Sequence, residues 1–575
     1  MPEKSWSLLL LIQRLMHALS AGEFLRCMVL SLIFVLTASN LLIASDGQSD
    51  DSEGPPNIVL IVADDLGFGD VKCFGQDRCL IPTPFLDQIA GEGIRYTNAY
   101  SSASVCVPSR MSIMTGRYAF RYPPPVKGGD WGFIGVQLPT KTRTLGSMLH
   151  QRGYETGYVG KWHLGTLMDT YDDKIQNIGT VDYSKPIKIG PKTFGFTHSF
   201  ILPGSLDMYP YAFVRDHHWV GDVTAVKGWS AFARMGPASH DFEDTSVLST
   251  LASEATRFIQ SKRKAPFFLF VGLTAPHTPS SPTNSFRGRS QVGVYGDYVM
   301  NTDYIIGSIV NALKKVDRVN NTLVIITSDH GPASYAGLRR KAISGQMKAV
   351  ERLGHYSRGP YRGYKFSAYD GGMRVPLILR WPNRIAPSQV SEQVISLVDI
   401  FATIDQITER SEQLENNNNN AAAPAPDSFS LFPPNDDEPQ RHPRPAIIME
   451  GTRSNAIRQG NWKLILGPGS GSPGRWGNTP AEDAAWKLAI QIHGKTPKSS
   501  AELEQYPFVQ LYHLEKDPAE TTNLASVEKE KVADLVSEIR RLIASGHSHP
   551  NKEPVDSRKI PLFKYIPGEI KKAIK

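Results

Sequence analysis

Three continuous apolar runs along the chain predict buried strands. They are residues 57–63 (NIVLIVA), 267–273 (FFLFVGL) and 322–327 (TLVIIT). A run that is apolar at every position is typical of a strand buried on both faces of a parallel sheet. Between the second and third runs, apolar residues recur with a helical period from Val299 to Leu313, which predicts an amphipathic helix. This alternation predicts an α/β fold with a large, mostly parallel sheet flanked by helices.

Polar residues follow two of the predicted strands directly. Asp64 and Asp65 end the first run, and Asp329 and His330 come just after the third. The carboxyl ends of parallel strands face a shared crevice, so we expect the two pairs to meet in space. Clustered carboxylates are tolerated where a cation neutralises them, and oxygen ligands favour hard cations such as Ca²⁺ or Mg²⁺. The other interpretation of an Asp-Asp pair is a helix cap or a turn.

The composition changes in the second half of the chain. A tract of Asn, Ala and Pro at residues 415–427 (ENNNNNAAAPAPD) cannot bury a core, and it predicts a linker over 411–440. A catalytic domain at 55–410 would precede it. Strand-like runs and a helical pattern from Val532 to Leu542 then predict a smaller sheet-plus-helix domain at 441–546, followed by a basic tail at 547–575.

The pattern of residues in the N-terminal region predicts an export signal. The apolar stretch 27–43 follows Arg26 and ends at the small residues Ala44 and Ser45, the order expected of a secretory signal peptide. The alternative is an uncleaved membrane anchor, although a span needs about 20 apolar residues and polar residues interrupt this stretch. Residues 1–45 therefore predict a secreted or periplasmic protein, with membrane attachment only if the segment is not cleaved.

Charge and cysteine content narrow the function further. The net charge of +7 is mild and the chain has no dense basic runs, which argues against a nucleic-acid partner.

Cys73 and Cys79 lie in one short loop and could pair in an oxidising compartment, leaving Cys106 as an odd thiol. Pro108 can open a helix with Cys106 at its N-terminal end. Taken alone, such a cysteine is either a buried small hydrophobe or a reactive thiolate.

The segment that begins at Cys106, CVPSRMSIMTGR, resembles the signature of the sulfatase family, a C-x-P-S-R core followed by T-G. The resemblance, which extends over about residues 55–525, implies an alkaline-phosphatase-like fold and the hydrolysis of sulfate esters. It also implies that a formylglycine-generating enzyme oxidises Cys106 to formylglycine before the chain folds. In the family, one hydroxyl of the hydrated aldehyde attacks sulfur, and deprotonation of the second expels sulfate afterwards.

The resemblance also implies roles for other residues. Asp64, Asp65, Asp329 and His330, together with Cys106, match the site of a divalent metal, for which Ca²⁺ is the favoured ion. His330 departs from the pattern, because many family members have Asn at this position. Its imidazole could bind the metal through nitrogen, which would favour transition metals, or it could contact the substrate instead.

Further matching residues are expected to handle the sulfate group and the leaving group. Lys161 and His163 lie in GKWHLG at the end of a predicted strand, where residues two positions apart would share one face. The resemblance implies that Lys161 binds sulfate, that His163 contacts the formylglycine hydroxyls, and that Arg110 orients the formylglycine. It likewise implies that His277 is the general acid and that Lys365 grips the sulfate and the bridging oxygen.

The sequence leaves the substrate open. Residues 204–215 (GSLDMYPYAFVR) resemble a loop near the pocket of arylsulfatase-A-like and N-acetylgalactosamine-6-sulfatase-like enzymes, which favours a sulfated sugar or an aryl sulfate. An aromatic surface loop is the other interpretation. Two other functions remain: a phosphomonoester or phosphonate hydrolase on the same fold, and a protein that binds sulfated glycans without catalysis.

Overall fold

The computed structural model describes residues 54–228, 234–340, 343–409, 425–432, 444–472, 482–549 and 560–574. Residues 55–575 form one compact unit. The predicted export segment 1–45, most of the linker 411–440 and part of the tail 547–575 lie outside the described residues. Among the residues that are described, no helix is both long and apolar enough to cross a bilayer.

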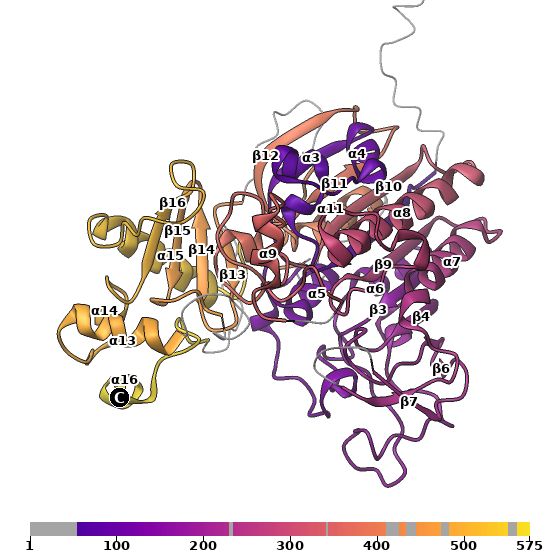
Figure 1. The fold of residues 1–575 in the computed structure, drawn as a ribbon, viewed down its shortest axis with the longest axis horizontal. Coiled ribbons are helices and arrows are strands. Elements are labelled where there is room, and N and C mark those ends of the chain that lie inside the picture. Colours follow the sequence, from indigo (N-terminus) through magenta and orange to yellow (C-terminus); the bar gives the residue numbers. More distant parts are fainter. Residues whose placement is uncertain are drawn as a thin grey trace, which may run out of the picture. The chain divides into compact units, whose positions relative to one another are not determined.

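A large sheet forms the centre of the fold (Figure 1). In the described part of the chain its ten strands run in the order β12-β2-β11-β10-β1-β9-β3-β4-β5-β6. The central strands β10, β1, β9, β3 and β4 are mutually parallel, and antiparallel pairs occur toward both sides. The strand bounds are β1 Asn57–Asp64, β2 Ile94–Tyr100, β3 Glu155–Lys161, β4 His198–Leu202, β5 Val214–Arg215, β6 His218–Trp219, β9 Phe267–Pro276, β10 Thr322–Ser328, β11 Leu377–Arg380 and β12 Gln389–Ser396. The three apolar runs are β1, β9 and β10, so these predictions are confirmed.

Helices cover both faces of the sheet, which explains why β1 is apolar throughout. Val59, Ile61 and Ala63 pack in one core with α4 (Pro84–Gly91), α7 (Val247–Gln260) and α8 (Gly293–Lys315). The alternate residues Ile58, Leu60 and Val62 pack in a second core with α5 (Cys106–Thr115), α6 (Leu145–Gln151) and α11 (Asp399–Thr408). Helix α8 contains the predicted amphipathic helix. Shorter helices are α3 Lys72–Gly75, α9 Gln346–Arg352 and α10 Asp370–Met373.

A smaller antiparallel sheet follows, in the order β13-β14-β15-β16 (orange to yellow in Figure 1). Its strands are β13 Ile447–Glu450, β14 Asn455–Gln459, β15 Trp462–Leu466 and β16 Gln510–His513, and its helices are α13 Glu482–His493, α14 Ser500–Leu503, α15 Lys529–Ala544 and α16 Gly568–Ala573. One face packs against α15. The other face packs against Tyr100 and Tyr369, which precede the smaller sheet in the chain. The predicted sheet-plus-helix element is therefore present, and the domain boundaries stay predictions. A two-stranded sheet, β7 Ala225–Lys227 and β8 Gly236–Ala238, stands apart from both.

Candidate active site

Four adjacent parallel strands bring the predicted residues to one edge of the large sheet. Asp64 is the last residue of β1 and Lys161 the last of β3, whereas His277 follows β9 and Asp329 follows β10. Lys161 Nζ lies 2.6 Å from Asp64 Oδ2. The backbone N–H of Asp65 donates to Asp329 Oδ1 at 3.2 Å. The two acidic pairs thus meet, as the strand pattern predicts.

The chain turns sharply at the end of β1. Asp65 has a left-handed backbone with φ of 64°, a conformation that Asp tolerates better than most residues. The next backbone N–H, of Leu66, donates to Ser328 Oγ at 2.9 Å and fixes the turn against β10. Because the turn follows directly on the strand end, Asp64 and Asp65 both belong to one buried cluster of side chains.

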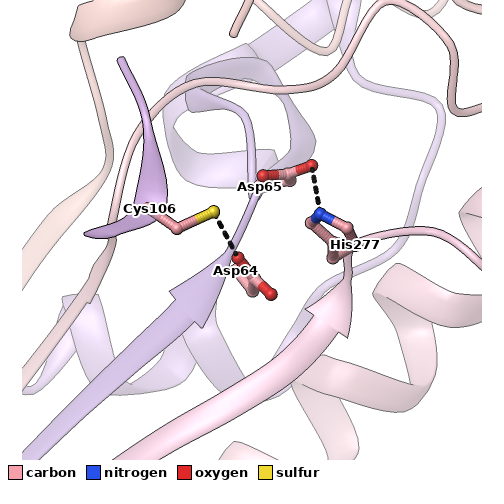
Figure 2. Close-up of side chains that lie close together, drawn as sticks. All are labelled: Asp64, Asp65, Cys106 and His277. Carbon is pink, nitrogen blue, oxygen red and sulfur yellow. Dashed lines mark hydrogen bonds and ion pairs between the residues drawn. The ribbon is translucent and has the colours of Figure 1, made fainter. Parts of the chain in front are cut away.

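Cys106 is the first residue of α5, as the position of Pro108 predicts. Its Sγ lies 3.6 Å from Asp64 Oδ1, 3.3 Å from His330 Nε2 and 3.5 Å from Lys365 Nζ. Figure 2 shows this side chain directed at the end of β1. Burial raises the pKa of the Cys106 thiol to about 12, so the unmodified side chain is uncharged near neutral pH.

The donor atoms around Cys106 fit a metal ion. One atom from each of Asp64, Cys106, Asp329 and His330 lies within 4.8 Å of the others, and Asp65 belongs to an overlapping group. Within the described residues, the buried Asp65 Oδ2 accepts no hydrogen bond. His330 Nδ1 lies 2.9 Å from the carbonyl oxygen of Gly331, and donation to it leaves Nε2 with a free lone pair 3.4 Å from Asp65 Oδ1. Each of the two groups thus brings two carboxylates and one imidazole together beside Cys106, and they share Asp64, so the combined set could hold a divalent cation.

Three basic side chains neutralise the carboxylates. Arg110 Nε lies 3.0 Å from Asp329 Oδ2, and Lys365 Nζ lies 2.7 Å from Asp65 Oδ1. Burial alone would raise the pKa of Asp64, but Lys161 and the other nearby cations hold it well below its usual range. At Asp65 burial prevails over the attraction of Lys365 and raises the pKa to about 7. Buried charges of both signs therefore surround Cys106.

Two histidines complete the cluster. His277 Nε2 lies 3.8 Å from Asp65 Oδ2 (Figure 2), while Nδ1 lies 2.6 Å from the carbonyl oxygen of Thr278. His163 lies beyond the end of β3 with φ of 52°, so the expectation that it shares a strand face with Lys161 is wrong. The strand ends at Lys161 and the chain turns. His163 is nevertheless close enough that burial and the charge of Lys161 lower its pKa well below the usual value.

Comparison with known proteins identifies the family. The sulfatase family model matches residues 56–409, more than half of the chain. The chain belongs to the sulfatase family. It is therefore a sulfuric ester hydrolase, and the larger sheet with its flanking helices is the fold of this family.

Sulfatases from bacteria and animals are similar to it. An N-acetylgalactosamine-6-O-sulfatase of Bacteroides thetaiotaomicron is 30% identical over 541 residues, covering 88% of this chain and 96% of the relative. The steryl-sulfatase of Rattus norvegicus is 33% identical over 406 residues, 62% of this chain and 67% of the relative. A solved structure from work on glycosaminoglycan metabolism by Bacteroides thetaiotaomicron superimposes with a TM-score of 0.69 at 28% identity, covering 85% of this chain and 99% of that one.

Asp207, a residue without a motif of its own in the sequence, lies beside the cluster of this sulfatase. Asp207 Oδ1 is 3.8 Å from His277 Nδ1, and the side chain is buried. The available signal was its place in the segment 204–215. Nothing in a loop sequence without periodicity indicates which of its side chains points inward.

Cys73 and Cys79, which with Cys106 are the cysteines of the described residues, are not bonded to each other. Cys73 and Cys79 are both free thiols, so the disulfide that their spacing allows is not formed in this structure. Cys79 Sγ instead lies 3.3 Å from the carbonyl oxygen of Ile81. Cys106 is also a free thiol.

Proposed function

We propose that this sulfatase hydrolyses the sulfate ester of a sugar, with a formylglycine made from Cys106 and a divalent cation. The observation that carries the proposal is the position of Cys106 Sγ, within 3.6 Å of a carboxylate, an imidazole and an ammonium group in one buried cluster. The sugar is favoured because the relative named N-acetylgalactosamine-6-O-sulfatase aligns over 88% of the chain, whereas the rat steryl-sulfatase aligns over 62%.

The metal ligands in this proposal are Asp64, Asp65, Asp329 and His330, next to the modified Cys106. A bound divalent cation would polarise the oxygens of the sulfate group. The three carboxylates favour Ca²⁺, or Mg²⁺ as an alternative, and the nitrogen of His330 would also accept another divalent ion. Arg110 would keep its contact with Asp329 and hold this ligand in place.

The basic residues of the chain stabilise charge during the reaction. Attack on sulfur shifts negative charge onto the sulfate oxygens and the leaving oxygen, and preorganised ammonium groups in a buried site stabilise that shift. Lys161 and Lys365 are the two ammonium groups, each already 2.6–2.7 Å from a carboxylate of the cluster. His277 would donate a proton to the leaving alkoxide from Nε2 as the imidazolium, with its Nδ1–H held by the carbonyl oxygen of Thr278. Burial lowers the pKa of His277 well below its usual value, so this step requires the bound anionic sulfate ester to stabilise the protonated ring. His163 contacts the hydroxyls of the formylglycine.

The timing of the modification follows from burial. Cys106 is 3% exposed and begins a helix inside the core. An enzyme that oxidises this side chain has no access to it in the folded protein. A formylglycine-generating enzyme would therefore act on the unfolded chain.

Export through residues 1–45 is part of the same proposal, on the basis of the signal-like order of basic, apolar and small residues. N-terminal sequencing of the protein recovered from the secreted or periplasmic fraction tests it. We expect a new N-terminus near residue 45. An intact N-terminus in the membrane fraction would mean an anchored enzyme, and recovery from the cytoplasm would contradict export.

Parallel kinetics test the activity. We expect turnover of para-nitrophenyl sulfate and of sulfated N-acetylgalactosamine. The kcat/KM for para-nitrophenyl phosphate should be far below the kcat/KM for either sulfate. Cys106→Ala should abolish turnover, whereas Cys79→Ala, which removes another buried thiol, should leave it intact. Faster cleavage of the phosphate would indicate a phosphomonoesterase, and binding of sulfated glycans without turnover would indicate a non-catalytic protein.

A further inference from the structure

Asp207 is a buried carboxylate beside the active site that the proposed mechanism does not use. Its side chain is 4% exposed. Oδ2 accepts a hydrogen bond from Arg234 Nη1 at 2.6 Å, whereas Oδ1 accepts none from the described residues. Burial raises the pKa of Asp207 because it disfavours the charged form. A buried acceptor without a donor costs free energy, so this oxygen calls for an explanation.

The unpaired oxygen faces the reaction centre across His277. Asp207 Oδ1 lies 3.8 Å from Nδ1 of this imidazole, and the other ring nitrogen, Nε2, lies 3.8 Å from Asp65 Oδ2. The ring thus lies between the carboxylate cluster and Asp207. With His277 against the ester oxygen, one imidazole ring would separate Asp207 from that oxygen.

We propose that Asp207 accepts a hydrogen bond from a hydroxyl group of the sugar that carries the sulfate, and that this contact selects sugar sulfates over aryl and steroid sulfates. The inference rests on the proposed function, since it requires the sulfate to be held at Cys106. An ionised carboxylate can only accept hydrogen bonds, and a sugar offers hydroxyl donors close to its ester oxygen. An aryl or steroid sulfate offers none there and leaves the buried oxygen unpaired, which disfavours its binding.

The carboxylate is held in position by its neighbours. The guanidinium group of Arg234 lies 3.4 Å from the centre of the Trp131 ring and also donates to the backbone oxygen of Asp207 at 3.0 Å. Trp131 has φ of 58°, a conformation that costs free energy in a residue other than glycine. The next residue, Gly132, donates its N–H to the carbonyl oxygen of Tyr209 at 3.0 Å. Arg234 therefore fixes Oδ2, the Trp131–Gly132 segment supports Arg234 and the loop of Asp207, and Oδ1 is preorganised as an acceptor.

Monodeoxy substrates separate recognition of a hydroxyl from other roles. We would measure kcat/KM for N-acetylgalactosamine 6-sulfate and for its analogues that each lack one ring hydroxyl, with the wild type, Asp207→Asn and Asp207→Ala. In the wild type, one analogue should lose roughly 10- to 100-fold, as expected for one hydrogen bond to a charged group. On the parent sugar, Asp207→Ala should have a kcat/KM lower than that of the wild type by a similar factor. On that analogue, the kcat/KM of Asp207→Ala should equal that of the wild type, because the contact is already missing. Asp207→Asn should lie between the two.

A uniform loss would overturn the inference. If Asp207→Ala lowers kcat/KM by the same factor on the parent sugar and on every analogue, Asp207 acts through His277 or through the fold. An unchanged kcat/KM on the parent sugar overturns the inference as well. Asp303→Asn is the matched control, because Asp303 is a buried carboxylate that accepts the backbone N–H groups of Phe85 and Leu86. It should leave the ratio between parent and analogue unchanged.

Para-nitrophenyl sulfate keeps this test apart from that of the proposed function. A wild-type enzyme that cleaves neither this ester nor any sugar sulfate contradicts the proposed function, and the inference falls with it. A wild type that cleaves the sugar sulfate but discriminates against none of the deoxy analogues contradicts the inference alone.

Discussion

Lys463 is a buried cation that joins the smaller sheet to the segment carrying Lys365. Its Nζ lies 2.7 Å from Asp370 Oδ1 and 2.8 Å from Glu520 Oε1, and none of its surface is exposed. Glu520 Oε2 accepts the backbone N–H of Asp370 at 2.7 Å. Asp370 begins α10, five residues after Lys365. Lys463→Met would keep most of the apolar stem and leave two buried carboxylates without their shared cation.

The size of the effect follows from this geometry. Removing one partner of a buried ion pair costs about 3–5 kcal/mol, and we expect Lys463→Met to lose stability in that range. Burial raises the pKa of Glu520 from 4.5 to about 7 in the folded protein even with Lys463 beside it. The folded state then keeps a proton that the unfolded state releases between these values, so stability falls as pH rises through this window. Without Lys463 the folded pKa is higher still, and the deficit relative to the wild type grows with pH.

Thermal unfolding at about pH 5.5 and about pH 8 tests this reasoning. Lys463→Met should lower the apparent melting temperature by roughly 3–5 °C, with the larger loss at the higher pH. Arg121→Met is the control for activity. It breaks another buried ion pair, Arg121–Asp427 at 2.7 Å. Arg121 contacts α15 and not the segment that carries Lys365. Below both melting temperatures, only Lys463→Met should lose turnover. A loss of under about 1 °C, or one that shrinks as pH rises, would refute the reasoning.

Three further predictions concern the active site. Dialysis against a chelator should abolish turnover and lower the melting temperature, because the carboxylates lose their cation. Addition of Ca²⁺ should restore both turnover and melting temperature. Full activity in excess chelator would contradict the metal assignment. His330→Asn should keep activity but shift metal preference toward Ca²⁺, because an amide oxygen replaces a nitrogen ligand. Titrations with Ca²⁺ and Mn²⁺ measure this preference, and an unchanged order of affinity for the two ions would mean that His330 is not a ligand. His277→Ala should lower kcat on a sugar sulfate roughly 10²–10⁴-fold. It should lower kcat on para-nitrophenyl sulfate much less, because nitrophenolate leaves without a proton. Equal losses of kcat on the two substrates would argue that His277 is not a general acid.

The core of the site was predictable because it depends on a general property of parallel sheets. Asp64, Asp65, Asp329 and His330 follow strands whose apolar runs are evident in the sequence, and adjacent parallel strands end at the same edge. Cys106 was predictable from its signature and from the helix that Pro108 opens. These inferences need no knowledge of the loops between the elements.

Other features depend on the path of loops and were not predictable. His163 lies past the end of β3, and no periodicity shows that the strand stops at Lys161. Asp207 reaches His277 only because its loop folds back toward the sheet. Lys463, in β15 of the smaller sheet, pairs with Asp370 in α10, 93 residues away, and each residue alone has the sequence character of an ordinary surface charge.

The central claim is that Cys106 is converted to formylglycine, and the mass of the peptide that contains it tests this directly. Trypsin releases residues 96–110 between Arg95 and Arg110. After treatment of the mature protein with iodoacetamide, we predict an unalkylated peptide, lighter than the cysteine form by the exchange of sulfur and two hydrogens for oxygen, that reacts with a hydrazide. A peptide recovered only as the alkylated cysteine, from protein that turns over sulfate esters, would contradict the account.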